Sequence, residues 1–297
     1  MDTELSITEQ LTYSTIRIEC DLGNGRGSTG TGFLFKFLEE SKKHIPAIVT
    51  NKHVVRGALR GSFRFTLADD NGAPLDNKHE IFQFNDFENN WIMHPDENVD
   101  LCIMPIGEIL NDAFNRQVRL FYISMDKSLI MNVEEINQLT AMEDIIMIGY
   151  PNGIWDSVNN MPILRRGITA THPKFDYEGK EEFMIDAACF PGSSGSPVML
   201  FNIGSMPMRN GGIGIGNRVK LLGVLYAGPQ HTTTGDIRVV NIPVRQEHVS
   251  ISRIPNNLGN VIKANKILEF EEILKNLYYP QVRILYDIVK QKGGRLL

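Results

Sequence analysis

Short runs of alternating or continuously apolar residues fill the first half of the chain and are separated by turn residues. Residues 14–22 and 62–67 alternate between apolar and polar positions, whereas residues 33–37 and 45–50 are mostly apolar. A period of two is typical of half-buried strands, and short apolar runs bounded by turns are typical of buried strands. The pattern predicts consecutive β-strands, with residues 107–118 as a short helix.

The second half continues in the same way. Strands are predicted over residues 98–105, 143–150 and 220–228, and the two glycine-rich stretches 23–32 and 211–216 predict loops. Neither stretch favours nucleotide binding, and the first lacks both the GxxxxGK[ST] pattern and a following helix. Many short strands with turn signals between them are typical of an all-β barrel or sandwich.

The periodicity changes after residue 258. Six apolar residues lie at positions close to the spacing of one helix face, namely Ile267, Leu268, Phe270, Ile273, Leu274 and Leu277. Pro280 ends this predicted helix, and residues 282–289 can form a second one. The chain is therefore expected to end in a helical tail.

Composition narrows the classes of function. The chain has 297 residues, a formal charge of −5 and three cysteines without a CxxC pair. An all-β domain can exceed 200 residues, and the acidic balance gives no footprint for nucleic acid. The cysteine and histidine spacings favour neither a disulfide framework nor a metal site, and we expect no cofactor. With no signal peptide and no membrane-length apolar run visible, we expect a reduced, soluble, cytoplasmic protein without membrane contact.

One stretch carries candidate chemistry. In residues 190–198, FPGSSGSPV, Ser194 lies in a tight turn between Gly192 and Gly195, directly before an apolar run. Glycines allow a sharp bend that leaves the hydroxyl unshielded. The same bend can aim the N–H groups of Gly192 and Ser194 into one pocket that could hold an oxyanion. A serine nucleophile also needs a base.

The candidate base and its partner are His53 and Asp100. Of the seven histidines, only His53 directly follows a compact apolar strand and precedes two valines. Asp100 begins a strongly apolar run, where a carboxylate needs a partner that offsets its desolvation. In a triad, His53 would take the proton of Ser194 and pass it to the leaving amine, while Asp100 orients the imidazole.

Three motifs in this order resemble the chymotrypsin-fold (trypsin-like) serine peptidases, most closely the bacterial trypsin-like and HtrA-type protease domain without a PDZ domain. They are TNKHV at residues 50–54, VDLC at residues 99–102, and DAA leading to GSSGSP at residues 186–197. The resemblance implies two six-stranded antiparallel β-barrels with the active site between them in residues 1–265, followed by a C-terminal helical tail in residues 266–297.

The resemblance also implies a serine endopeptidase that acts on polypeptides through a His-Asp-Ser triad and an acyl-enzyme. Ser196 departs from it, because many relatives carry a second glycine at that position. By resemblance, the pocket for the residue before the scissile bond is walled by Ala188, Cys189, Leu225, Tyr226, Ala227 and Gly228. None of these is charged, which disfavours cleavage after Lys, Arg or Glu and predicts small or medium apolar residues. The main chain of residues 226–228 could pair with an extended substrate.

Two alternatives compete with this interpretation. In an α/β-hydrolase the serine opens a helix, and the acid and histidine follow it, whereas here Pro197 and Val198 lead into a strand. A catalytically silent scaffold that keeps the fold to bind a partner is the second alternative, and three reactive groups argue against it. The helical tail could also dock a regulatory protein or a second copy.

Overall fold

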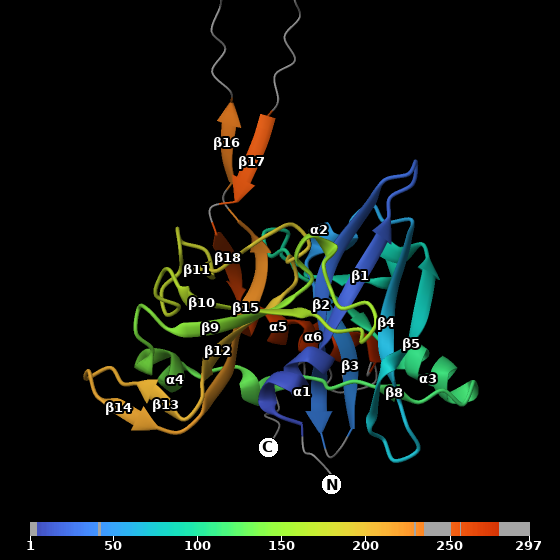
Figure 1. Cartoon of the computed structure of the whole chain (residues 1–297), viewed down its shortest axis with the longest axis horizontal. Helices are drawn as coiled ribbons and strands as arrows, with labels where there is room; N and C mark the ends of the chain where they lie inside the picture. The colour runs from blue at the N-terminus through green and yellow to red at the C-terminus, as the bar shows by residue number, and fades with distance from the viewer. Residues whose placement is uncertain (1–4, 41–42, 229, 235–250, 256, 279–297) are drawn as a thin grey trace, which may run out of the picture.

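The body of the molecule combines an open sheet and a closed barrel (Figure 1). The computed structural model describes residues 5–40, 43–228, 230–234, 251–255 and 257–278. The first half of the chain builds the sheet and the second half the barrel, and both contribute to one buried cluster of apolar side chains. The two halves are therefore joined by a shared core.

The sheet is antiparallel and has eight strands in the order β5-β4-β1-β2-β3-β7-β6, with β8 paired to β4. Alternation places Ile16 and Ile18 of the first strand in the core, as the sequence pattern predicts. The strands are β1 (Thr15–Asp21), β2 (Gly27–Glu40), β3 (Lys43–Thr50), β4 (Arg60–Ala68), β5 (Pro74–Asn85), β6 (Ile92–Met93), β7 (Cys102–Pro105) and β8 (Leu120–Phe121).

The barrel closes in the order β10-β11-β18-β15-β12-β9. Its members are β9 (Asp144–Gly149), β10 (Ile163–Thr169), β11 (Glu182–Asp186), β12 (Pro197–Asn202), β15 (Arg218–Ala227) and β18 (Leu258–Lys263). Two hairpins project from it, formed by β13 (Ser205–Pro207) with β14 (Ile213–Ile215), and by β16 (Gln230–Thr234) with β17 (Ile251–Pro255).

The prediction of a mainly β fold is confirmed, but the expectation of two closed six-stranded barrels is wrong for the first half. The edge strand β6 and its neighbour β7 span only two and four residues, and the two edges of the sheet, β5 and β6, do not pair with each other. Side chains from a 3-10 helix, from the residue after it and from a helix fill the sheet's core, among them Phe87, Trp91 and Ile109. Covering an open sheet with helical segments buries apolar surface without closure.

Helices lie at the periphery. They are α1 (Ile7–Tyr13), α2 (Lys52–Val55), α3 (Gly107–Asn115), α4 (Val133–Gln138), α5 (Asn265–Leu268) and α6 (Phe270–Tyr278), with 3-10 turns η1 (Phe87–Asn90), η2 (Lys127–Leu129) and η3 (Pro151–Gly153). None of the helices in the described part of the chain is long and apolar enough to span a bilayer.

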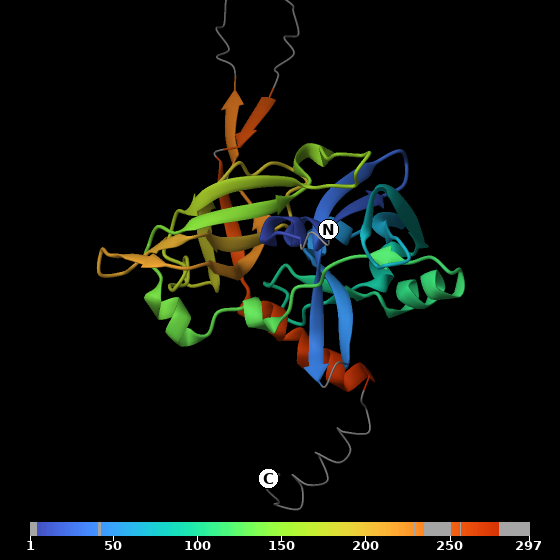
Figure 2. The same ribbon diagram turned by 60° about the horizontal axis from the view of Figure 1, so that its bottom comes forward.

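The described part of the tail packs on the chain's own core. Figure 2 shows α5 and α6 running from the barrel toward the ends of β2 and β3. Ile267, Phe270 and Leu274 are buried in the shared core, and the Glu271 carboxylate accepts the main-chain N–H of Leu38 at 3.1 Å. The second predicted helix, residues 282–289, lies outside the described residues, and docking of a partner on the tail stays a prediction.

Both glycine-rich stretches depart from the loop prediction. The turn of the first stretch covers only residues 23–26, and Gly30 and Gly32 lie inside β2. A Cβ at Gly30 would overlap Val54, and one at Gly32 would lie 3.0 Å from Ile18, so these glycines serve close packing. The second stretch forms part of the β13–β14 hairpin, because its residues pair with those of β13.

Candidate active site

His53 and Asp100 are in direct contact. His53 lies in α2, which starts two residues after β3 ends, and Asp100 lies two residues before β7. The imidazole Nδ1 is 2.5 Å from Asp100 Oδ2, and the main-chain N–H of His53 donates to Oδ1 at 3.1 Å. An ionised carboxylate only accepts hydrogen bonds, so Nδ1 carries the proton. Asp100 therefore holds His53 at two points, the ring and the main chain, and leaves Nε2 free to act as a base.

The loop that carries Asp100 is anchored to the start of α2. Asn51 Nδ2 donates to the Asp100 main-chain oxygen at 2.8 Å, and Lys52 Nζ donates to the Asp96 main-chain oxygen at 2.7 Å. Burial lowers the pKa of Lys52, and the charge of Asp100 acts against that shift. These bonds fix the carboxylate relative to the histidine.

Ser194 lies at the same junction, in the turn before β12. The main-chain N–H of Thr31 donates to the Ser194 carbonyl at 2.8 Å, while the Thr31 carbonyl accepts from Thr50 Oγ1 at 2.6 Å. One residue of β2 thus connects the serine turn to the end of β3, from which His53 follows. The Ser194 hydroxyl donates to the Tyr226 carbonyl at 3.4 Å, and it has no hydrogen bond to His53 in the described structure.

The main chain before Ser194 forms a turn that requires glycine at position 192. Gly192 has φ +86°, and a Cβ there would lie 2.5 Å from the Tyr150 oxygen, so the position needs glycine. Asn152 N–H donates to the Pro191 oxygen at 2.5 Å, and Thr31 Oγ1 donates to the Gly192 oxygen at 2.9 Å. Among the described residues the N–H groups of Gly192 and Ser194 have no acceptor, so both are available to an oxyanion.

Ser196, the departure from the family pattern, fits by an exchange of size with a neighbouring strand. Its side chain is fully buried, and a Cβ at Gly149 would overlap its Oγ. Because Gly149 has no side chain, it leaves space for the Ser196 hydroxyl.

The residues expected to wall the specificity pocket are close together. Cys189 and Leu225 are 8% and 3% exposed, and a Cβ at Gly259 would lie 2.6 Å from Cys189 Sγ and 2.5 Å from Leu225 Cδ1. Burial raises the pKa of Cys189 to about 11, which keeps the thiol neutral. Ala188 is half-buried and Gly228 is exposed. The side chains of Cys189 and Leu225 are thus uncharged and lie in the buried core of the barrel beside Gly259, and their role as a pocket wall stays a prediction.

Tyr226 and Ala227 belong to the end of β15. The Tyr226 hydroxyl donates to Glu182 Oε2 at 2.8 Å, and its pKa is raised to about 12, chiefly by burial. The Tyr226 hydroxyl thus bonds to Glu182, whereas Tyr226 contacts Ser194 through its main-chain carbonyl.

Three residues that shape the site were missed by reasoning from the sequence: Thr31, Asn152 and Arg165. Thr31 lay within a glycine-rich stretch read as a loop, and Asn152 acts through its main chain, at φ +51°. Arg165 donates to the Ala188 carbonyl and to Ser193 Oγ. Successive side chains of a strand face opposite sides, so the adjacent Arg165 and Arg166 were a signal that one arginine faces inward.

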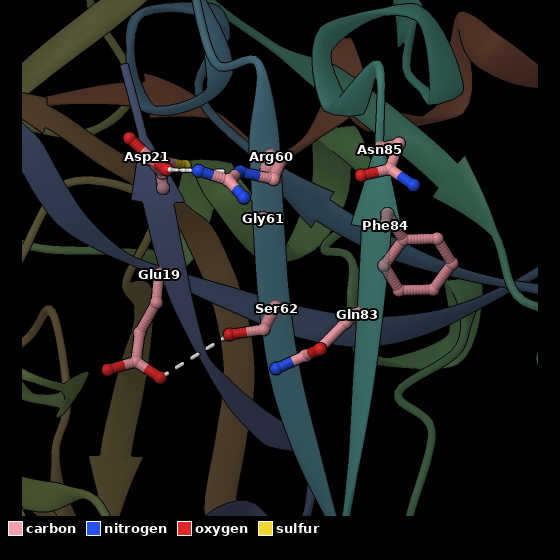
Figure 3. Close-up of a pocket in the computed structure, with 9 residues that line it drawn as sticks. Glu19, Asp21, Arg60, Gly61, Ser62, Gln83, Phe84 and Asn85 are labelled. Carbon is pink, nitrogen blue, oxygen red and sulfur yellow. Dashed lines mark hydrogen bonds and ion pairs between the residues drawn. The ribbon is translucent and has the colours of Figure 1, made fainter. Parts of the chain in front are cut away.

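A depression lies elsewhere on the described surface. It has a volume of about 580 Å³ and lies at β1, β4 and β5 (Figure 3), lined by Glu19, Cys20, Asp21, Arg60, Gly61, Ser62, Gln83, Phe84 and Asn85. Its opposite charges pair with each other, as in the 2.8 Å contact of Arg60 with Asp21. Within the described ranges, no cluster of three or more His, Cys, Asp or Glu side chains could hold a metal ion.

A closed antiparallel barrel beside an open sheet, with a His-Asp pair and a serine turn at their junction, is the arrangement of a chymotrypsin-like β protein. The family model described as trypsin-like peptidase domain matches residues 30–205, and the chain belongs to this family. No curated protein matches the chain.

Several solved structures are similar to this chain at low sequence identity. The inactive form of the Rv3671c protease of M. tuberculosis is 17% identical over 90% of this chain and 91% of that one, with a TM-score of 0.41. A serine endoprotease from Yersinia pestis is 14% identical over 92% and 68% of the two chains, with a TM-score of 0.45. The HtrA-type protease AlgW with a tripeptide is 14% identical over 91% and 62%, with a TM-score of 0.44.

Proposed function

We propose that the chain is a serine endopeptidase that hydrolyses peptide bonds through an acyl-enzyme. Ser194 is the nucleophile, His53 the general base and then acid, and Asp100 the carboxylate that orients the imidazole. The observation that carries the proposal is the two-point contact between Asp100 and His53 at the junction that also holds the serine turn. Membership of a peptidase family supports polypeptides as substrates.

The reaction begins when the Ser194 hydroxyl turns from the Tyr226 carbonyl toward His53 Nε2. The imidazole takes the proton as Oγ attacks the scissile carbonyl, and the N–H groups of Gly192 and Ser194 stabilise the oxyanion. Each such donor contributes about 3–4 kcal/mol in comparable sites. His53 then protonates the leaving amine, and a water molecule activated by the same imidazole releases the acyl group.

Small or medium apolar residues are the proposed substrates before the scissile bond. The uncharged side chains of Cys189 and Leu225 support this choice. The exposed Gly228 after the end of β15 leaves main-chain groups that could pair with an extended substrate. A cytoplasmic location is part of the proposal and is supported by three free, buried cysteines.

A peptide library followed by mass spectrometry tests this function. The wild-type protein should cleave after small or medium apolar residues, and Ser194→Ala should abolish cleavage. Ser62→Ala, which changes a serine on β4, serves as the matched control and should cleave normally. Equal cleavage by Ser194→Ala would contradict the proposed nucleophile, and cleavage confined to sites after Arg or Glu would contradict the proposed pocket. A folded protein without cleavage would favour the scaffold alternative.

A further inference from the structure

An arginine lies under the turn that precedes Ser194. In β10, Leu164 and Arg166 are exposed, so the alternation of the strand turns Arg165 inward. Its Nη1 donates to the Ala188 carbonyl, and its Nη2 donates to Ser193 Oγ at 2.8 Å. The guanidinium therefore contacts both ends of the segment 188–193.

This segment carries two parts of the proposed site. It supplies Cys189 to the pocket wall, and it ends at the N–H groups proposed to hold the oxyanion. Asn152 and Thr31 hold its outer side through Pro191 and Gly192. Within the described residues the two contacts to Arg165 are the side-chain hydrogen bonds that the segment receives from the barrel, and Ser193 is fully buried.

The position is costly for a cation. Arg165 has no carboxylate within ion-pair distance among the described residues, and its Nε is buried without an acceptor there. Burial lowers the pKa of Arg165, although a guanidinium stays protonated at neutral pH. A buried cation without a counter-ion is destabilising unless its hydrogen bonds return that free energy. Arginine suits the place because its planar fork reaches two acceptors at once, which lysine does not match.

We propose that Arg165 is a positioning residue that holds segment 188–193 in the conformation in which the Gly192 and Ser194 N–H groups point into one pocket. The inference rests on the proposed peptidase function. It assigns the shape of the oxyanion pocket to a side chain of the barrel rather than to the loop itself. Arg165 has no role in proton transfer.

Steady-state kinetics test the role in catalysis. We expect Arg165→Met to lower kcat by about tenfold to a hundredfold with little change in KM, because displaced oxyanion donors act on the transition state. Arg165→Lys keeps the charge but loses the fork, and its kcat should fall in the same direction. The control is Arg166→Met on the same strand, whose exposed side chain pairs with Asp144 at 3.1 Å, and its kcat should be unchanged. Methylguanidinium should restore part of the activity of Arg165→Ala.

Hydrogen exchange of residues 187–196, measured in a Ser194→Ala background, tests positioning independently of activity. Arg165→Met should speed exchange in this segment and leave the strands of the sheet unchanged. Faster exchange in a protein whose wild type cleaves nothing would retain the positioning role and reject the peptidase. Unchanged exchange and unchanged kcat would overturn the role of Arg165. If Arg165→Met does not fold, a fully active Arg165→Lys would overturn it instead.

Discussion

Replacing Asp100 by asparagine changes the proposed site by a single atom. Asp100 Oδ1 accepts the main-chain N–H of His53 at 3.1 Å, and Oδ2 lies 2.5 Å from Nδ1. An asparagine has one oxygen and can serve only one of these two donors. If its oxygen stays with the main-chain N–H, its amide NH₂ faces Nδ1, and the imidazole proton moves to Nε2. His53 can then no longer take the proton of Ser194.

The expected loss is large for activity and small for stability. A wrong tautomer in this kind of triad costs about 10⁴-fold in kcat, which corresponds to about 5.4 kcal/mol. The His53 and Asp100 side chains are 46% and 23% exposed, so solvent screens the pair, and its loss should lower the unfolding free energy by no more than about 1 kcal/mol.

Hydrolysis of a peptide substrate and thermal unfolding, measured on the same samples, separate the two effects. The control is Asp96→Asn in the same loop, whose exposed carboxylate accepts the N–H of Asn98 at 2.9 Å and should leave kcat unchanged. An Asp100→Asn protein that retains more than a tenth of the wild-type kcat would refute the reasoning.

Three further predictions follow from packing around the site. Gly195→Ala should lower the unfolding free energy by about 3 kcal/mol or more, because φ is +87° and the new Cβ would overlap the Thr31 oxygen; urea unfolding measures this, and an unchanged midpoint would contradict it. Trp155→Ala should lower the unfolding free energy by about 1–2 kcal/mol and Trp155→Phe by less, because the guanidinium groups of Arg17 and Arg64 each lie 5.1 Å from the centre of the Trp155 ring. Equal thermal stability of Trp155→Ala and wild type would count against these contacts. A thiol reagent at pH 8 should modify the cysteines only after unfolding, since burial raises the pKa of each above its usual range, to about 11 for Cys20 and Cys189 and well above it for Cys102; rapid modification of the folded protein would contradict this burial.

Local patterns were sufficient for several strands and drew attention to the candidate site. Period-two alternation located β1 and β4, because each has one buried face, and the sequence setting of His53 and Asp100 drew attention to a pair that the structure brings into contact. Each of these patterns involves only a few neighbouring residues of the sequence.

The features that the sequence could not predict depend on contacts between distant segments. Gly30 and Gly32 lie in a strand whose neighbours Val54 and Ile48 leave no room for a side chain at either position. No local pattern in the sequence reveals this close packing. The open edge of the first sheet likewise depends on how α3 and η1 fill its core. Arg165 was missed because its partners lie more than 20 residues away along the chain.

Reaction with a fluorophosphonate, followed by peptide mapping, tests the central claim most directly. The account predicts one covalent adduct, on Ser194, that forms much more slowly in His53→Ala and is absent in Ser194→Ala. An adduct on another serine, or a rate on Ser194 that does not depend on His53, would contradict the proposed triad.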